Sequence, residues 1–405
     1  MSEVVNIPQL RFPEFNGEWE EKALGVVATI TTGSTPSTSN NEYYDGDVAF
    51  VSPADIQGNR IVRSTKTTIT ELGLSVVREI KKRSTLFVCI GSTIGKVSQA
   101  GVNCATNQQI NALTAKNSFD NDFIYSLLEF KAPRIKLLAG VQAVPQINKS
   151  EFSRFKFTFP LLPEQQKIAA FLTAVDNKIE QLSKKQALLG EYKKGLMQQI
   201  FSQAIRFKAD DGSEFPDWED NTIDKALHSY KLGGNYSNSE AVTDYPLIKM
   251  GNLDRGNIKL NKLQYINTEE NIDDSDKINY GDLFFNTRNT LDLVGKVAIW
   301  RDELPCAYYN SNLMKMEFSD NFFMNYRFNS FDGIKALRRV ATGTTSVAAI
   351  YTKDLLKIKF SLPTLSEQQK IANFLSSIDT KIEQAGKQLD ESKQFKKALL
   401  QQMFV

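Results

Sequence analysis

The chain has 405 residues, a formal net charge of +2, one histidine and three cysteines. Its length predicts two or three domains, and its 41% hydrophobic content is ordinary for a globular protein. A single histidine, His228, excludes histidine-rich metal sites, and Cys89, Cys104 and Cys306 are too widely spaced for a disulfide framework or a zinc ribbon. Sparse cysteines fit a reducing cytoplasm, and the sequence predicts neither a signal peptide nor a transmembrane helix.

Residues 1–160 are predicted to form a mixed domain. Two segments have the character of helices, Thr70–Lys82 and Phe123–Leu138. Short β-rich segments bounded by turn residues predict strands at Asp47–Val51, Leu86–Ile90 and Lys156–Phe159. We therefore expect an α/β or α+β domain with a curved sheet.

The first polar loop, Thr31–Asn41, is rich in short hydrogen-bonding side chains. Such groups and the backbone amides beside them bind phosphates and base edges, although a solvated loop has the same composition. The candidates for nucleic-acid contact in this loop are Thr32, Ser34, Thr35, Ser37 and Asn40. A basic cluster follows at the expected helix end, formed by Arg78, Lys81, Lys82 and Arg83. It suits either phosphate contact or a solvated helix end, and Lys82 and Arg83 are its candidate contacts.

The segment Gly91–Lys96 resembles a Walker A loop but is one residue short, and Val97 stands where Mg²⁺ needs Ser or Thr. We interpret it as a turn in a DNA-facing loop, with Ser92, Thr93 and Lys96 as candidate contacts. Next come the candidates Asn107, Gln108 and Gln109. Asn and Gln pair bidentately with adenine, and they also cap turns, so both interpretations stay open here.

A long helix is predicted over residues 161–203. Pro160 and Pro163 mark its start, and the acidic Glu164 suits the first turn. Apolar residues then recur at alternating steps of three and four, which is the heptad pattern of a coiled coil.

The second half of the chain repeats this plan. The segments that start at Val144 and Val347 align without a gap, and 26 of 58 positions are identical. The chain is therefore a tandem duplication: a second domain over residues 204–363, with a strand at Lys357–Leu362, precedes a second long helix over 364–405. The second copy has its own candidate contacts at positions that echo the first or lie between them: Lys231, Asn235, Tyr236, Lys249, Asn252, Arg288, Asn289, Thr290, Lys296, Asn310 and Asn312.

Two narrow apolar stripes in one chain most simply pack on each other. An antiparallel pairing would place the two domains at opposite ends of a spacer of about 57 Å. The residues expected to build this pair and to dock partners are Glu164, Gln165, Ile168, Leu172, Ile179, Glu367, Gln368, Ile371, Leu375 and Ile382.

The sequence carries none of the common catalytic motifs, neither GxGxxG, HExxH nor GxSxG. One alternative is an enzyme with an unrecognised carboxylate site near Asp45 and Asp47 or near Asp273, Asp274 and Asp276, although the acidic run Glu269–Asp276 is most simply a solvated loop. Another alternative is a coiled-coil scaffold with protein-binding domains.

Taken together, these motifs resemble the specificity subunit of a type I restriction–modification system. The resemblance rests on the loop Thr31–Pro36, the Gly-Lys-Val turn, and the doubled EQQKIAxFL helix start at Glu164 and Glu367. It covers essentially the whole chain. The second copy departs from the pattern, because Gly233-Gly234-Asn235-Tyr236 replaces the first loop.

The resemblance implies a non-catalytic subunit in which each mixed domain is a target recognition domain for one half of a bipartite, asymmetric DNA site. The helix pair would fix the gap between the half-sites. Two methyltransferase subunits would bind this chain and supply S-adenosylmethionine. Two restriction-motor subunits, which use ATP and Mg²⁺, would complete a nuclease. No cofactor or metal is expected on the chain itself.

Overall fold

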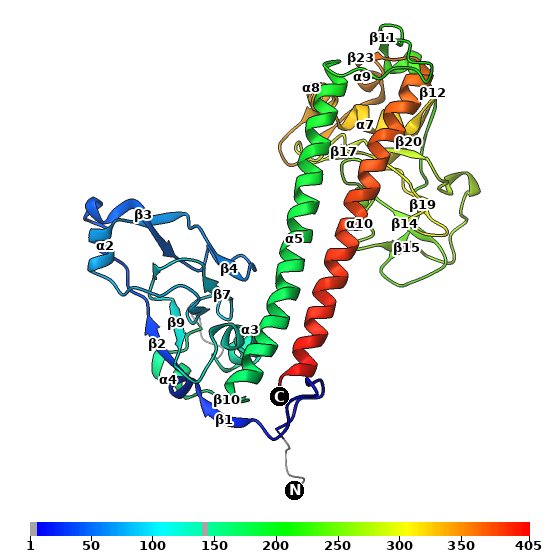
Figure 1. Ribbon diagram of the computed structural model, residues 1–405. Helices are drawn as coiled ribbons and strands as arrows, with labels where there is room; N and C mark the ends of the chain where they lie inside the picture. Colours follow the sequence, from blue (N-terminus) through cyan, green and yellow to red (C-terminus); the bar gives the residue numbers. More distant parts are fainter. Residues whose placement is uncertain (1–5, 140–144) are drawn as a thin grey trace. The chain divides into compact units, whose positions relative to one another are not determined.

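The computed structural model describes residues 6–139 and 145–405; Val144, where the first copy of the repeat begins, lies outside them. The chain divides into two compact units. Unit 1 comprises residues 1–186 and 384–405, and unit 2 comprises residues 187–383. Each unit therefore contains one mixed domain, the first part of the long helix that follows it, and the last part of the other long helix (Figure 1).

Unit 1 builds its domain from short strands around one long helix. Its helices are α1 Leu24–Val27, α2 Glu71–Ser75, α3 Asn121–Leu138, α4 Lys149–Arg154 and the start of α5 Leu162–Phe201. Its strands are β1 Glu20–Ala23, β2 Ala28–Thr32, β3 Tyr44–Val51, β4 Ile61–Val62, β5 Thr67–Ile69, β6 Thr85–Val88, β7 Val97–Ala100, β8 Cys104–Thr106, β9 Ile110–Ala115 and β10 Lys156–Phe159. They form a five-stranded sheet in the order β2-β9-β6-β7-β4, a three-stranded sheet β5-β3-β8 and the pair β1-β10.

Unit 2 repeats this plan with more irregular strands. Its helices are α6 Ile223–Ala226, α7 Asn321–Asn329, α8 Phe331–Val340, α9 Thr352–Leu355 and the start of α10 Leu365–Met403. Its strands are β11 Glu219–Thr222, β12 Leu227–Leu232, β13 Asn238–Ser239, β14 Pro246–Ile248, β15 Gln264–Ile266, β16 Leu283–Asn286, β17 Arg288–Asn289, β18 Val297–Ile299, β19 Tyr308–Tyr309, β20 Leu313–Phe318, β21 Thr342–Gly343, β22 Ala348–Ala349 and β23 Lys359–Leu362. The sheets are β12-β20-β16-β18, β13-β15-β14-β19, β17-β22-β21 and β11-β23.

The mixed α/β class and the two long helices are as predicted, and the strands near residues 47–51, 86–90, 156–159 and 357–362 all form. The predicted helix Thr70–Lys82 is wrong beyond its first turns, because α2 ends at Ser75. The reason is Ile80, which is buried and pairs as a β-bridge with Cys104, so the chain there is extended. Arg83 consequently lies in a turn, with φ of 71°, and not at a helix end.

The helix pair is antiparallel inside unit 1. Asp176 of α5 contacts Lys396 of α10, and ten residues further along α5 Gln186 contacts Gly386, ten residues earlier in α10. The expected seam residues face inward: Ile168 and Leu172 are buried in α5. In unit 2 the same holds for Ile371, Leu375 and the half-buried Ile382 of α10, which share a core with Ile200 at the end of α5. The end of α10 likewise contributes to the core of unit 1.

Candidate nucleic-acid interface

In unit 1 the predicted polar loop lies directly against the Asn107–Gln109 turn. The amide of Gly33 donates to the carbonyl of Ile110 at 3.0 Å, and the Thr35 hydroxyl donates to Oε1 of Gln108 at 2.8 Å. The approach is so close that a Cβ on Gly33 would lie 2.2 Å from the Asn107 carbonyl oxygen, which requires glycine there. Two segments that are more than 70 residues apart in sequence thus form one surface.

The remaining candidates of this loop are ordered by local hydrogen bonds. The Thr32 hydroxyl donates to Oδ1 of Asn111 at 2.7 Å, and Asn40 caps a short turn by accepting from the Glu42 amide. Ser37 is exposed and lies 2.8 Å from the hydroxyl of Ser39. Ser34 is half-buried. The loop therefore presents hydroxyl groups from a defined conformation, which lowers the entropy cost of binding.

The Gly91–Lys96 segment is a tight turn, with positive φ at Gly91 (95°) and Gly95 (90°). Gln109 reaches the carbonyl of Ile90 at its edge, at 3.4 Å, so this turn adjoins the other two segments. Ser92 is exposed and Thr93 half-buried. Lys96 bends back to the Pro53 carbonyl at 3.5 Å, which gives it a role in holding the turn.

The basic cluster is divided between two places. Arg78 donates to the Thr32 carbonyl at 2.7 Å and so lies beside the polar loop. Arg83 instead pairs with Asp122 at the start of α3, where the hydrogen bond raises the pKa of the guanidinium. The Lys82 backbone amide bonds to Asn103. The described contacts therefore join Arg78, but not Lys82 or Arg83, to the candidate surface.

Unit 2 places the corresponding segments together in the same way. The amide of Gly233 donates to the Leu313 carbonyl at 3.3 Å, and the Ser311 amide donates to Gly234 at 2.9 Å. A Cβ on Gly233 would lie 2.2 Å from the Tyr309 carbonyl oxygen. Asn310 is buried and its Oδ1 has no partner among the described residues, whereas Asn235 and Asn312 are more accessible.

The electrostatics of this second surface differ from those of the first. Lys231 lies 2.8 Å from Asp276 and 3.2 Å from Asp273, so its charge is largely neutralised. Tyr236 donates to Asp276 at 2.6 Å, and burial raises the pKa of its phenol to about 12. Hydrogen bonds from Ser275 and then Lys231 lower the pKa of Asp273 to about 2. Most of the acidic run is exposed, as expected of a solvated loop, but its last residue Asp276 is 2% exposed and holds Tyr236 of the polar loop.

Two further candidates in unit 2 form hydrogen bonds within their own loop. Asn252 is 3% exposed, and its amide donates to the carbonyls of Lys259 and Asn261. Lys249 donates to Asn238 at 3.0 Å and to Gln264 at 2.8 Å. In this structure both side chains fix loop shape and do not point freely into solvent.

A hollow of about 260 Å³ lies beside Arg288, which is exposed at the edge of the small sheet β17-β22-β21. Asn312 and Tyr351 line the same hollow, so the predicted Arg288 and Asn312 segments do meet. Tyr351 is 53% exposed and was not predicted as a contact. No motif marks this residue in the sequence. Neighbouring candidates serve the loops: Asn289 accepts from the Thr290 amide, and Lys296 donates to Leu253 at 3.1 Å.

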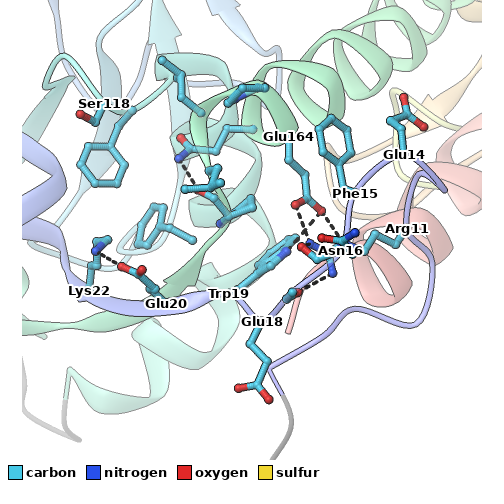
Figure 2. A pocket seen from close by; sticks show the side chains of 18 of the residues that line it. Arg11, Glu14, Phe15, Asn16, Glu18, Trp19, Glu20, Lys22, Ser118 and Glu164 are labelled. Carbon is cyan, nitrogen blue, oxygen red and sulfur yellow. Dashed lines mark hydrogen bonds and ion pairs between the residues drawn. The ribbon is translucent and has the colours of Figure 1, made fainter.

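The start of each long helix is an intramolecular anchor. In unit 1 Glu164 accepts from both Nε and Nη2 of Arg11, at 2.8 and 2.7 Å, and from the Trp19 indole at 3.3 Å (Figure 2). Gln165 bonds to the Asp120 amide and the Pro160 carbonyl. Arg11, Trp19 and Glu164 line a surface pocket of about 930 Å³.

Unit 2 repeats the anchor residue by residue. Arg206 and Trp218 donate to Glu367, and Gln368 donates to the Pro363 carbonyl at 2.9 Å. Glu164 and Glu367 are 3% and 0% exposed. Their side chains are therefore used inside the chain, holding the segment that precedes each domain, and are not presented to a partner.

Among residues 6–139 and 145–405 there is no cluster of three or more metal-ligating side chains, and no helix there is long and apolar enough to cross a membrane. The conspicuous groups in both units are hydroxyl, amide and guanidinium groups on loops. These groups suit hydrogen bonding to phosphates and base edges.

Comparison with known proteins identifies the family. The family model described as "Type I restriction modification DNA specificity domain" matches twice, over residues 16–189 and 228–391. The chain belongs to the type I restriction–modification specificity family. Both copies of the specificity domain fall on the repeat predicted from the sequence, and the expectation of a DNA specificity subunit, non-catalytic by itself, is confirmed.

Relatives and solved structures agree with this membership. The chain is 25% identical to the type I restriction enzyme MjaVIII specificity subunit of Methanocaldococcus jannaschii, over 96% of this chain and 92% of that protein. The crystal structure of a type I S subunit from M. genitalium shares the fold, with a TM-score of 0.65 and 16% identity, covering 98% and 99% of the two chains. A structure described as the basis of complex assembly and conformational transition of the type I restriction–modification system gives a TM-score of 0.53 and 16% identity, covering 96% and 97%.

Proposed function

We propose that each unit of this specificity subunit reads one half of a bipartite, asymmetric DNA site, and that the pair of long helices sets the gap between the halves. The observation that carries the proposal is the contrast within the repeat. The helix starts are nearly identical, down to the Arg–Glu–Trp anchor, while the loop surfaces differ in charge and shape. Identical helices suit identical partners, and different surfaces suit different base sequences.

Each surface has the chemistry for base readout. In unit 1, Thr35, Gln108 and Gln109 offer donors and acceptors of the kind that pair with adenine. In unit 2, Arg288 is exposed and suits guanine or phosphate, while Asn312 lies beside it. Because the chain as a whole is nearly neutral, these local groups must supply the attraction to DNA.

The helices also offer two equivalent contact points for a partner. Tyr192 of α5 and Phe395 of α10 occupy the same position of the repeat and are 55% and 54% exposed. Exposed aromatic side chains are enriched among the residues that dominate protein–protein binding. We infer that two methyltransferase subunits dock on this subunit, one on each helix, and that two restriction-motor subunits join the full complex.

In this assembly the chemistry resides in the partners. The methyltransferase subunits would bring S-adenosylmethionine for adenine methylation, and the motor subunits would use ATP and Mg²⁺. The chain's own contribution is the choice of sequence. Its free, scattered cysteines fit assembly in the reducing cytoplasm.

The test is to purify the chain together with its methyltransferase subunit and to map methylated adenines in DNA treated with the complex. We expect one bipartite motif with a fixed gap, lost when the chain is omitted. Exchanging residues 204–363 for the corresponding domain of another specificity subunit should change one half only. A change in both halves would contradict the assignment of one half to each unit.

A coiled-coil scaffold whose domains bind protein is the second candidate, favoured only by the long helices. It predicts a stable complex that shows no sequence preference on DNA. A methylation motif that depends on this chain would exclude it.

A further inference from the structure

One position in the hydrophobic seam of each long helix is filled by lysine. Lys193 falls between Leu189 and Leu196 of α5, and Lys396 falls between Ser392 and Leu399 of α10. Lys396 is only 8% exposed. Because a buried ammonium group is costly unless it is paired, each lysine needs a specific partner.

In unit 1 that partner is a carboxylate of the other helix. Nζ of Lys396 lies 2.6 Å from Oδ1 of Asp176 in α5, and it also contacts Glu129 of α3 at 2.5 Å. Nη1 of Arg60 lies 2.9 Å from the second oxygen of Asp176. Arg60 and Lys396 both lie over the ring of Tyr125 in α3, at 4.7 and 5.7 Å. The cluster thus joins both long helices to the helix and the sheet of the mixed domain.

Unit 2 contains a similar cluster. Nζ of Lys193 lies 2.5 Å from Oδ1 of Asp379 and 5.0 Å from the ring centre of Tyr326, whose hydroxyl donates to Asp379 at 2.7 Å. Both the lysines and the aspartates correspond in the repeat. The arginine does not: Arg60 precedes β4, whereas Arg301 follows β18 and reaches to 4.0 Å from Asp379. The lysine–aspartate pair recurs, although the arginine beside it comes from a different segment of the domain.

We propose that these two charge clusters, Lys396–Asp176–Arg60 and Lys193–Asp379–Arg301, are positioning devices that fix each mixed domain on the helix pair. A shift of the helices by one heptad would keep apolar contacts in the seam but would separate lysine from aspartate, so the pair selects one register. Each lysine acts on the domain that it does not directly follow in sequence: Lys396 of α10 positions the first domain, and Lys193 of α5 positions the second. This inference rests on the proposed function only where DNA methylation is its readout.

The first test replaces each lysine by methionine, which keeps the volume of the seam but removes the charge. With Lys396→Met we expect methylation of the half-site read by the first domain to slow by on the order of tenfold or more, since small misplacements of reacting groups are costly. Lys193→Met should slow the other half. The exposed neighbours Lys397→Met and Lys194→Met are matched controls and should behave as wild type, and Lys396→Arg should restore the rate.

Equal slowing of both halves by either variant would overturn the proposal, because a merely structural role has no preference for one half. Unchanged rates would overturn it as well. Circular dichroism and co-purification with the methyltransferase establish that a variant is folded. If Lys396→Met does not fold, Lys396→Gln replaces it, since glutamine removes the charge while its amide lowers the cost of burial; the same slowing of the first half is expected.

A second readout needs no DNA. Spin labels at Lys136→Cys in α3 and Lys393→Cys in α10, both exposed and both in unit 1, report the position of the domain on the helices. A Cys306→Ser background suffices, because burial raises the pKa of the Cys89 and Cys104 thiols to about 12. We expect a narrow distance distribution in the wild type and a broadened one with Lys396→Met. Identical distance distributions in the wild type and in Lys396→Met would overturn this proposal, whatever the methylation experiment shows. The absence of a bipartite methylation motif would instead overturn the proposed function.

Discussion

At the scale of single residues, the buried glutamates Glu164 and Glu367 explain why both helix starts carry the same sequence. Each carboxylate binds an arginine through two hydrogen bonds and an indole through a third. Such a charged pair adds little net stability over an apolar pair of the same size, but the loss of one partner leaves the other charge buried. These two carboxylates therefore serve folding, and the exposed positions of the same helices stay accessible to a partner.

Replacing Glu164 by Gln should lower the free energy of unfolding by about 3 kcal/mol, because Arg11 then lacks a counter-charge in a partly buried place. Urea denaturation of the purified chain measures this. Glu18→Gln, on an exposed residue of the same pocket, is the control and should change the midpoint little. If the two variants unfolded at the same urea concentration, the anchor role would be wrong.

Tyr192 and Phe395 allow a test of partner number. Tyr192→Ala and Phe395→Ala each remove one exposed aromatic contact, and loss of an aromatic side chain that acts as a binding hot spot costs about 2 kcal/mol or more. We expect each single variant to retain one methyltransferase subunit and the double variant to retain none, as read by native mass spectrometry. Loss of both subunits from a single variant would contradict independent docking on the two helices.

At the scale of elements, the long helices were the part of the fold most open to prediction. A heptad pattern over some 40 residues is a strong local signal, and α5 and α10 span 40 and 39 residues. The lysines in the seam were not predicted as part of it, because a pattern read from apolar residues passes over a charged position. Their partners lie on the other helix, which local sequence does not reveal.

The loops that carry the candidate contacts were likewise predictable only in part. The repeat indicated which segments correspond, and the structure does bring the 31–41 loop to the 107–109 turn. What the sequence could not give was which side chains face solvent: Asn252 and Asp276 are polar yet buried. The predicted helix at residues 70–82 failed for a related reason, since the bridge between Ile80 and Cys104 outweighed local helix propensity.

If the helix pair sets the gap between the half-sites, then longer helices should give a wider gap. Inserting one heptad after Gln186 in α5 and one after Ala385 in α10 keeps the seam intact in both units. Seven residues add about 10 Å, or about three base pairs of DNA. Methylation mapping should find the same half-sites with a gap wider by that amount. A changed half-site sequence with an unchanged gap would contradict the spacer role.

At the scale of the whole molecule, the core of each unit includes the last turns of the long helix that begins in the other unit. Phe404, just beyond α10, packs against Trp19 and Phe123 in unit 1, at ring distances of 6.3 and 5.3 Å. Phe201 at the end of α5 packs against Trp218 and Phe323 in unit 2. The two phenylalanines occupy the same position of the repeat. Each aromatic cluster therefore combines residues from both copies.

Phe404→Ala should therefore destabilise the N-terminal domain, although the change is at the other end of the sequence. Removing a buried Phe side chain typically costs about 3–5 kcal/mol. Hydrogen exchange should rise in α3 with Phe404→Ala and in α7 with Phe201→Ala, each leaving the other helix protected. Faster exchange of α7 in the Phe404→Ala variant would refute this division of the core.

The exchange of helix ends between the two copies also sets the order in which the units can fold during synthesis. Unit 2 is one continuous stretch, residues 187–383, so its core is complete before the ribosome has made the last turns of α10. Unit 1 needs Leu399, Leu400, Met403 and Phe404 to close its core. The first domain to emerge is thus the last to finish, and until then it exposes apolar surface of the kind that chaperones bind.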